Sequence, residues 1–209
     1  MNLARSERQA LADLLEEAGP DRPTLCQGWR TKELLAHLLV RERRPDAGLT
    51  QLIRPLAGHL KSVTEAFERR PWSEQVGLLR SGPPSWNPMG WGKLEELSNS
   101  AEMFIHHEDA RRGVPDWKPR VFDAETTAQL TKVLDSKAMR IVLRGIKCGV
   151  AAEIPDGRKI TMKGGEPEVV VHGAPGEVLL WAFGRDACDV DVTGSDAAIS
   201  AANGGHRGL

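Results

Sequence analysis

The hydrophobic pattern of this chain changes near its middle, from helical spacing to the short runs and turns that are typical of strands. In the first part, apolar residues recur every three or four positions, which predicts amphipathic helices. A helix stops where glycine and proline follow it, as at Gly19–Pro20 and at Gly113 and Pro115. The four predicted helices cover about residues 2–18, 31–45, 49–69 and 93–112, with Pro55 as a kink in the third.

The second part of the chain combines short strands with short helices, after a predicted helix at about 123–144. The predicted strands are 149–153, 159–162, 168–171 and 188–192, and the predicted helices are 175–183 and 196–202. Helices followed by a mixed segment favour an α+β protein. We therefore predict a four-helix bundle in residues 1–118 and a small C-terminal α+β domain in residues 119–209. The segment 71–91 is predicted to be irregular, because its prolines and glycines interrupt any period.

The composition excludes several classes of function. The 28 lysines and arginines balance 29 acidic residues, which argues against a nucleic-acid or membrane-surface partner. No apolar run is long enough to span a bilayer, and the N-terminal segment has the pattern of an amphipathic helix instead of a signal peptide. Three widely spaced cysteines fit no disulfide framework, so we expect a cytoplasmic protein, either a monomer or a homodimer.

The run from Glu102 to Asp109 carries the main candidate site. Glu102 and His106 are four residues apart, so in a helix they project from one face as half of a metal site. His37, from the apolar stripe of the helix at 31–45, is the candidate third ligand, and three protein ligands leave one position open for catalysis. Asp109 follows by one turn and is a candidate to orient a ligand histidine. His107 points away and is interpreted as a packing or surface residue, with a smaller chance of substituting as ligand.

Each candidate has a simpler alternative. His37 alone is more typical of a buried histidine satisfied by one hydrogen bond than of a metal ligand. Glu102 and His106 have a spacing that is common on solvated helix faces, and Asp109 would pair with a nearby arginine. The apolar residues 103–105 favour the metal site, because they indicate a largely buried helix in which a carboxylate needs a partner.

Three motifs give a family resemblance. Residues 26–38, CQGWRTKELLAHL, resemble the signature C-x-G-W-x-x-x-(D/E)-L-x-x-H-L of mycothiol-dependent maleylpyruvate isomerase and related actinobacterial proteins of the DinB-like metal-binding superfamily. The pattern Glu-x-x-x-His-x-x-Asp over residues 102–109 resembles the second signature of that family. Residues 178–185 and 192–194 resemble the Leu-x-Gly-Arg and Val-x-Gly pattern of its C-terminal domain, although Ala182 replaces the leucine. The run 41–46 resembles an uncharacterised actinobacterial subgroup more than the isomerase itself.

The resemblance implies a DinB-like bundle that binds a divalent metal through His37, Glu102 and His106. Zn²⁺ suits this donor set, and Fe, Ni or Co are alternatives. In mycothiol-dependent members the metal activates that small thiol, so the resemblance implies zinc and mycothiol as cofactors, with a small electrophile as substrate. Coordination of a thiol to zinc gives the thiolate, which is the nucleophile.

Arg185 is the candidate group for binding a substrate carboxylate, because a planar guanidinium matches that anion. Its alternative role is to complement a helix C-terminus and to pair with Asp186 or Asp189. Cys26 has no evident histidine partner in the sequence and is predicted to pack beneath Trp29. The predicted function is a thiol-dependent transferase or isomerase, in which Asp109 orients the metal ligands. The alternatives are a metal-assisted hydrolase and a non-catalytic metal- or ligand-binding protein.

Overall fold

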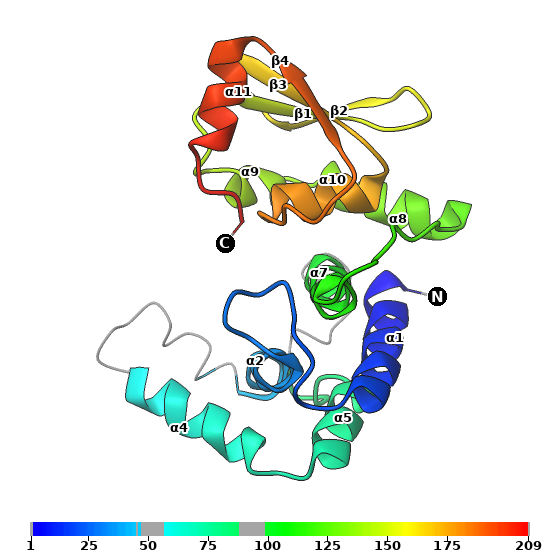
Figure 1. Ribbon diagram of the computed structural model, residues 1–209, viewed down its shortest axis with the longest axis vertical. Coiled ribbons are helices and arrows are strands. Elements are labelled where there is room, and N and C mark those ends of the chain that lie inside the picture. The colour runs from blue at the N-terminus through cyan, green and yellow to red at the C-terminus, as the bar shows by residue number, and fades with distance from the viewer. Residues whose placement is uncertain (1, 45, 47–56, 88–98, 209) are drawn as a thin grey trace. The chain divides into compact units, whose positions relative to one another are not determined.

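The structure is a computed structural model, and it describes residues 2–44, 46, 57–87 and 99–208 (Figure 1). The chain divides into two compact units, Met1–Trp117 and Lys118–Leu209, one residue before the division expected from the sequence. The first unit is helical, and the second combines helices with a four-stranded sheet. The predicted α+β class is therefore confirmed. None of the helices in the described ranges has the length and apolar character that a membrane crossing requires.

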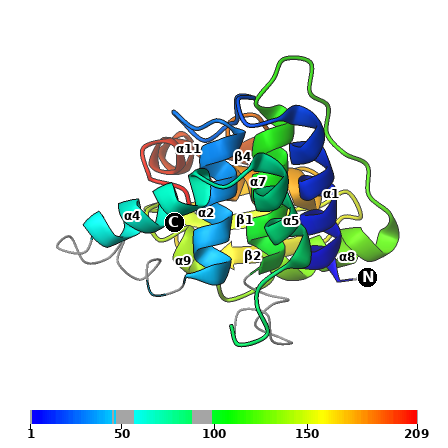
Figure 2. The ribbon, with the colours of Figure 1, turned by 90° about the horizontal axis from the view of Figure 1, so that it is seen from below.

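Five helices are described in the first unit, and three of them run alongside one another (Figure 2). These three are α1, α2 and α7, and α1 packs closely against α7. The shorter α4 and α5 both contact α2, and α5 also contacts α1. The bounds are α1 Leu3–Ala18, α2 Thr31–Arg43, α4 Ala57–Glu68, α5 Trp72–Ser81 and α7 Ser100–Arg112.

Local sequence signals explain where α1 and α2 begin and end. The side chain of Asn2 accepts a hydrogen bond from the backbone N–H of Ala4 at 2.8 Å, which caps the start of α1. Gly19 ends that helix with φ of 73°, a conformation that glycine adopts without steric cost. Glu33, in the first turn of α2, accepts a hydrogen bond from the backbone N–H of Arg30 at 2.8 Å.

The core of the first unit is built from the leucine stripes that the helical periodicity predicts. These side chains are shielded from water, and their burial supplies the main stabilising free energy of the unit. The cluster includes Leu11, Leu15, Leu34, Leu35, Leu38, Leu39, Val63, Phe67, Val76, Leu79 and Met103.

Two buried polar contacts join α1 to its neighbouring helices. Arg8 of α1 donates to Glu42 of α2 across 2.7 Å, and both side chains are almost fully shielded from water. His107 of α7 lies 2.7 Å from Glu7 of α1, measured from Nδ1 to Oε2. His107 therefore packs inside the unit, as one of its two sequence-based interpretations expected.

Helix α5 corrects the prediction that residues 71–91 are irregular. Pro71 occupies the N-cap position of this helix and Gly82 its C-cap position, so neither residue lies within it. Both residues mark boundaries, and the ten residues between them contain no proline and a single glycine, Gly77, which the helix accommodates. Residues 88–91 lie outside the described part of the chain, as do the predicted helical residues 49–56, with the kink at Pro55, and 93–98.

The second unit contains a sheet with strand order β2-β1-β3-β4 (Figure 1). Strand β1 pairs with β2 antiparallel and with β3 parallel, and β3 pairs with β4 antiparallel. Helix α11 contacts β3 and β4. The bounds are α8 Ala124–Leu134, α9 Met139–Val142, β1 Gly149–Glu153, β2 Lys159–Lys163, β3 Glu168–His172, α10 Pro175–Ala182, β4 Asp191–Gly194 and α11 Asp196–Asn203.

Two predicted elements of the second unit differ from the structure. The long helix expected at 123–144 is divided into α8 and α9, because Asp135 and Ser136 form the end of α8 and a turn. The last strand was expected at 188–192 but covers Asp191–Gly194, where it pairs with Val169–His172 of β3. Cys188 lies before it in a tight turn, in which its backbone N–H donates to the carbonyl of Asp186 at 2.9 Å.

Candidate metal centre

Helix α7 brings three candidate side chains onto one face of the first unit. Glu102, His106 and Asp109 follow one another at helical spacing, and the helix is buried along most of its length. The exposed fraction falls from 18% for the Glu102 side chain to 0% for Asp109, so the charged face runs from the edge of the unit into its interior. A carboxylate placed this deeply requires a polar or cationic partner.

His37 of α2 meets this face at Glu102. The Nε2 atom of His37 lies 3.3 Å from Oε1 of Glu102, and Nε2 of His106 lies 3.3 Å from the same oxygen. The two imidazole rings are 5.2 Å apart between centroids, at an interplanar angle of 68°. The structure therefore brings together the three residues expected to be metal ligands, with two nitrogen atoms and one oxygen atom converging.

The spacing of these atoms fits a divalent metal. Zinc bonds to histidine nitrogen and carboxylate oxygen are about 2.0–2.1 Å long, so neighbouring ligand atoms of a tetrahedral site are roughly 3.3 Å apart. Both distances to Oε1 of Glu102 have this value, and all three candidate ligand atoms lie within 4.8 Å of one another. Two imidazoles and one carboxylate also leave a fourth position for another ligand.

Asp109 lies behind His106 and contacts the other nitrogen of its ring. Its Oδ2 atom is 2.9 Å from Nδ1 of His106 and accepts a hydrogen bond from Sγ of Cys26 at 3.2 Å. A carboxylate on the far nitrogen fixes the tautomer and orientation of a ligand histidine. Arg111 and Arg112, the arginines of the alternative interpretation, both contact Glu108.

Cys26 contributes to this cluster in a way that the sequence did not indicate. Like Trp29, it packs against the core, and its thiol also contacts Asp109. Cys26, His106 and Asp109 form a second group whose ligand atoms lie within 4.8 Å of one another. This group surrounds a fully buried carboxylate, whereas His37 and Glu102 retain 25% and 18% side-chain exposure. Of these two groups of described residues, the one with His37 and Glu102 has the more exposed carboxylate.

The electrostatics of the centre favour a charged pair. Burial raises the pKa of Glu102, but hydrogen bonds with His106 and His37 and the charge of Arg41 outweigh it, so this pKa lies well below its usual range. Burial lowers the pKa of His106, but hydrogen bonds with Asp109, Cys26 and Glu102 raise it well above the usual value of histidine. These neighbours therefore favour the protonated form of His106 and the ionised form of Glu102.

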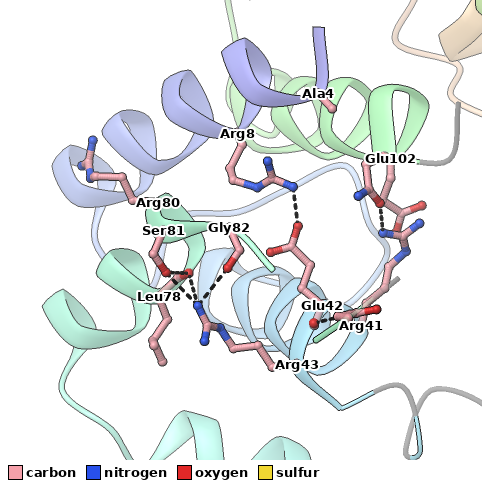
Figure 3. Close-up of polar contacts among 12 residues, drawn as sticks. Ala4, Arg8, Arg41, Glu42, Arg43, Leu78, Arg80, Ser81, Gly82 and Glu102 are labelled. Carbon is pink, nitrogen blue, oxygen red and sulfur yellow. Dashed lines mark hydrogen bonds and ion pairs between the residues drawn. The ribbon is translucent and has the colours of Figure 1, made fainter. Parts of the chain in front are cut away.

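Arg41 is a second residue of the centre that the sequence analysis did not single out. Its Nε atom lies 3.4 Å from Oε1 of Glu102, and its Nη1 atom donates to Oδ1 of Asn99 at 2.6 Å (Figure 3). The sequence contains one signal for it, because Arg41 follows His37 by one helical turn, as His106 follows Glu102.

The loop before α2 is hydrogen-bonded to, and packs against, the end of α7. The backbone N–H of Leu25 donates to the carbonyl of Asp109 at 3.0 Å, and Gly113 lies directly against the backbone of Pro23. A Cβ atom at position 113 would lie 2.1 Å from the carbonyl oxygen of Pro23, which no real structure tolerates. Glycine at this position therefore permits the close approach that places Cys26 beside Asp109.

We expect Gly113→Ala to lower the free energy of unfolding by roughly 1–3 kcal/mol, because the added methyl group forces the loop away from α7. Urea denaturation followed by circular dichroism measures the change. Gly77→Ala is the matched control, since this helical glycine has open space around it and alanine there stabilises a helix by about 0.5–1 kcal/mol. Equal stability of the two variants would contradict the packing argument.

Arg185, the candidate for anion binding, belongs to the second unit. It follows α10, and its Nη1 atom donates to the carbonyl of Phe183 at 2.7 Å, at the end of that helix. Of its two expected acidic partners, Asp186 accepts from Arg207 at 2.8 Å, and the backbone N–H of Asp189 donates to Glu177 at 2.9 Å. Arg185 is thus placed where a helix C-terminus favours a cation.

Known proteins resemble the chain in one sequence segment and in overall fold. Residues 3–44, which include α1 and α2, match the family model of the mycothiol maleylpyruvate isomerase N-terminal domain. A crystal structure of the mycothiol-dependent maleylpyruvate isomerase has a TM-score of 0.56 and 16% identity, and the match covers 91% of this chain and 90% of that chain. A histidine-to-alanine mutant of that isomerase has a TM-score of 0.57 and 15% identity, with the same coverage. No curated protein has a significant sequence match.

The fold and the converging ligands define an α+β protein whose helical unit carries a candidate metal centre. Residues 3–44 match the model of the mycothiol maleylpyruvate isomerase N-terminal domain, and the fold is similar to that of the solved isomerase over 91% of the chain. The resemblance indicated by the sequence motifs is thereby confirmed.

Proposed function

We propose that the protein is a metal-dependent enzyme that uses a small thiol, of the isomerase or S-transferase type, with mycothiol as the thiol. The observation that carries this proposal is the convergence of two imidazole nitrogens on one oxygen of Glu102, at the 3.3 Å spacing of tetrahedral ligands. The family match at residues 3–44 and the shared fold support a thiol-dependent isomerase activity. The substrate is a small electrophile.

His37, Glu102 and His106 would hold the metal, most favourably Zn²⁺, in the helical unit. A metal there would lower the pKa of a thiol in the fourth position, so that its thiolate is available near neutral pH. Asp109 holds the ring of His106 in place through Nδ1. The partly exposed His37 and Glu102 leave one side of the centre accessible.

The chemistry of a thiolate gives two outcomes from one addition step. The sulfur adds to an electrophilic carbon of a double bond, and the electron pair of that bond moves to the neighbouring group. Rotation about the resulting single bond and loss of the same thiolate give isomerisation, in which the thiol is recycled. Departure of another leaving group instead gives a stable thioether, which is S-transfer. We propose that Arg185, in the second unit, binds a carboxylate, because a planar guanidinium matches that anion.

The test supplies the zinc-loaded protein with maleylpyruvate, with and without mycothiol, and follows the substrate by its absorbance. Consumption that requires the thiol is the expected result, and recovery of the thiol separates isomerisation from transfer. Consumption without thiol would indicate a metal-assisted hydrolase in which water takes the open position. Zinc binding with no turnover of maleylpyruvate or of a haloarene would indicate a non-catalytic binding protein.

We expect Asp109→Asn to weaken zinc binding by about 10–100-fold, because the amide no longer supports the imidazole of His106 as a carboxylate does. Competition with a chromophoric chelator measures the affinity. Asp13→Asn, on the exposed surface of α1, is the control and is expected to retain wild-type affinity. Unchanged affinity of the Asp109 variant would show that this carboxylate does not act on the metal ligands.

A further inference from the structure

The Arg41 guanidinium places a positive charge directly beside the carboxylate of a candidate metal ligand. Its Nε atom lies 3.4 Å from Oε1 of Glu102 (Figure 3). The two imidazole nitrogens approach the same oxygen at 3.3 Å. The positive charge of Arg41 also helps to hold the pKa of Glu102 low, after the hydrogen bonds from His106 and His37 have outweighed burial. Arg41 thus compensates the charge of the one carboxylate among the candidate ligands.

A metal ion at Oε1 of Glu102 places two further positive charges next to this guanidinium. Like charges at such separations repel strongly in a partly buried site, where the effective dielectric is well below that of water. The side chain of Arg41 is only 20% exposed, so solvent screens this repulsion incompletely. We propose that Arg41 competes with the metal for Glu102, which lowers metal affinity and keeps the metal exchangeable. This inference rests on the proposed metal centre.

A hydrogen bond to Asn99 would hold the guanidinium in place when a metal coordinates Glu102. Its Oδ1 atom accepts from Nη1 of Arg41 at 2.6 Å, and the Asn99 side chain is fully buried just before α7 begins. A neutral amide oxygen anchors Arg41 without supplying a negative charge. Arg41 therefore remains beside the centre in both states and adds to its positive charge, which favours an anionic ligand in the open position.

The test compares the zinc affinities of four proteins by competition with a chromophoric chelator at one pH. Arg41→Gln removes the charge and is expected to bind zinc about tenfold more tightly or better, because the repulsion is lost. Arg41→Lys keeps the charge and is expected to stay close to the wild type. Arg44→Gln removes an equal charge from the exposed end of α2, where Arg44 pairs with Asp46, and is expected to change little.

Weaker zinc binding by Arg41→Gln would overturn the inference, because it would show that Arg41 supports Glu102 as a ligand. Unchanged affinity would overturn it as well. Circular dichroism of each variant ensures that a loss of binding is not a loss of folding. Failure of the proposed function is recognised separately: neither the wild type nor Arg41→Gln would bind zinc stoichiometrically. Zinc binding by Arg41→Gln but not by the wild type would support the inference, because it is the expected increase in affinity at its largest.

Discussion

Replacing His37 with alanine is expected to weaken zinc binding by more than about 100-fold, beyond the effect of losing a residue that only supports a ligand. His37 is the one candidate ligand from α2, and its Nε2 atom lies 3.3 Å from Oε1 of Glu102. Without it, two protein ligands from α7 remain, and two ligands do not form a stable zinc site. Thiol-dependent turnover is expected to fall with the zinc content, as measured by metal analysis of the purified protein.

The matched control is His59→Ala, which removes an exposed histidine of α4 that contacts Asp46. This variant is expected to retain zinc and activity. The hypothesis of a metal centre would be abandoned if the His37 variant kept stoichiometric zinc, or if neither protein contained it. Retained activity in a zinc-free His37 variant would point to chemistry that does not use this centre.

Arg8→Met is expected to lower the free energy of unfolding by about 3–5 kcal/mol, the cost of breaking one side of a buried ion pair. Arg8 and Glu42 are 3% and 0% exposed, and Arg8 donates to Glu42 at 2.7 Å between α1 and α2 (Figure 3). Methionine fills much of the arginine volume, so the loss arises from a carboxylate left without its closest cation. Urea denaturation provides the measurement.

The free energy of unfolding that Arg8→Met loses is expected to depend on pH. Burial, which outweighs the charge of Arg8, raises the pKa of Glu42 above its ordinary value of 4.5, and removal of Arg8 raises it further. A raised pKa means that the folded state binds the proton more tightly than the unfolded state does. The stability lost by the Arg8 variant is therefore smallest near pH 4.5, where Glu42 is largely protonated in both folded proteins. It grows as the pH rises through the folded-state pKa of Glu42. A deficit that shrinks at higher pH would contradict this account.

Two further variants separate the buried pair from surface effects. The double variant Arg8→Met, Glu42→Leu removes both charges and is expected to recover most of the lost stability, because no buried charge remains. Arg80→Met removes an arginine that pairs with Asp13 and Glu16 at the exposed surface, and little change is expected.

Helical periodicity predicted the main elements of the first unit because its leucine stripes face a single core. The failure at α5 has a local cause: Pro71 and Gly82 stand at the boundaries of a helix, and the density of prolines and glycines around it concealed the regular residues between them. The displacement of β4 has a tertiary cause. Its position is set by pairing with β3, and no period within residues 188–194 encodes that register.

The spacing of Glu102, His106 and Asp109 could be predicted from the sequence because one helix carries all three residues. That His37 meets them is a property of how α2 packs near α7, which its place in the apolar stripe suggested and the family resemblance made specific. Cys26 and Arg41 lie on other elements and contact the centre through tertiary packing. No spacing within either motif reveals such contacts.

The backbone hydrogen bond between Leu25 and Asp109 and the close contact at Gly113 bear on how the protein would take up a metal. They join the loop before α2 to the end of α7, independently of any ion. In small zinc domains, the metal supplies the free energy that folds the chain, and chelators unfold them. Here the leucine core and this hydrogen bond bring the candidate ligands together without a metal. If the proposed centre binds a metal, its uptake and release would therefore be a binding equilibrium on a folded protein, and the apoprotein would be expected to remain folded.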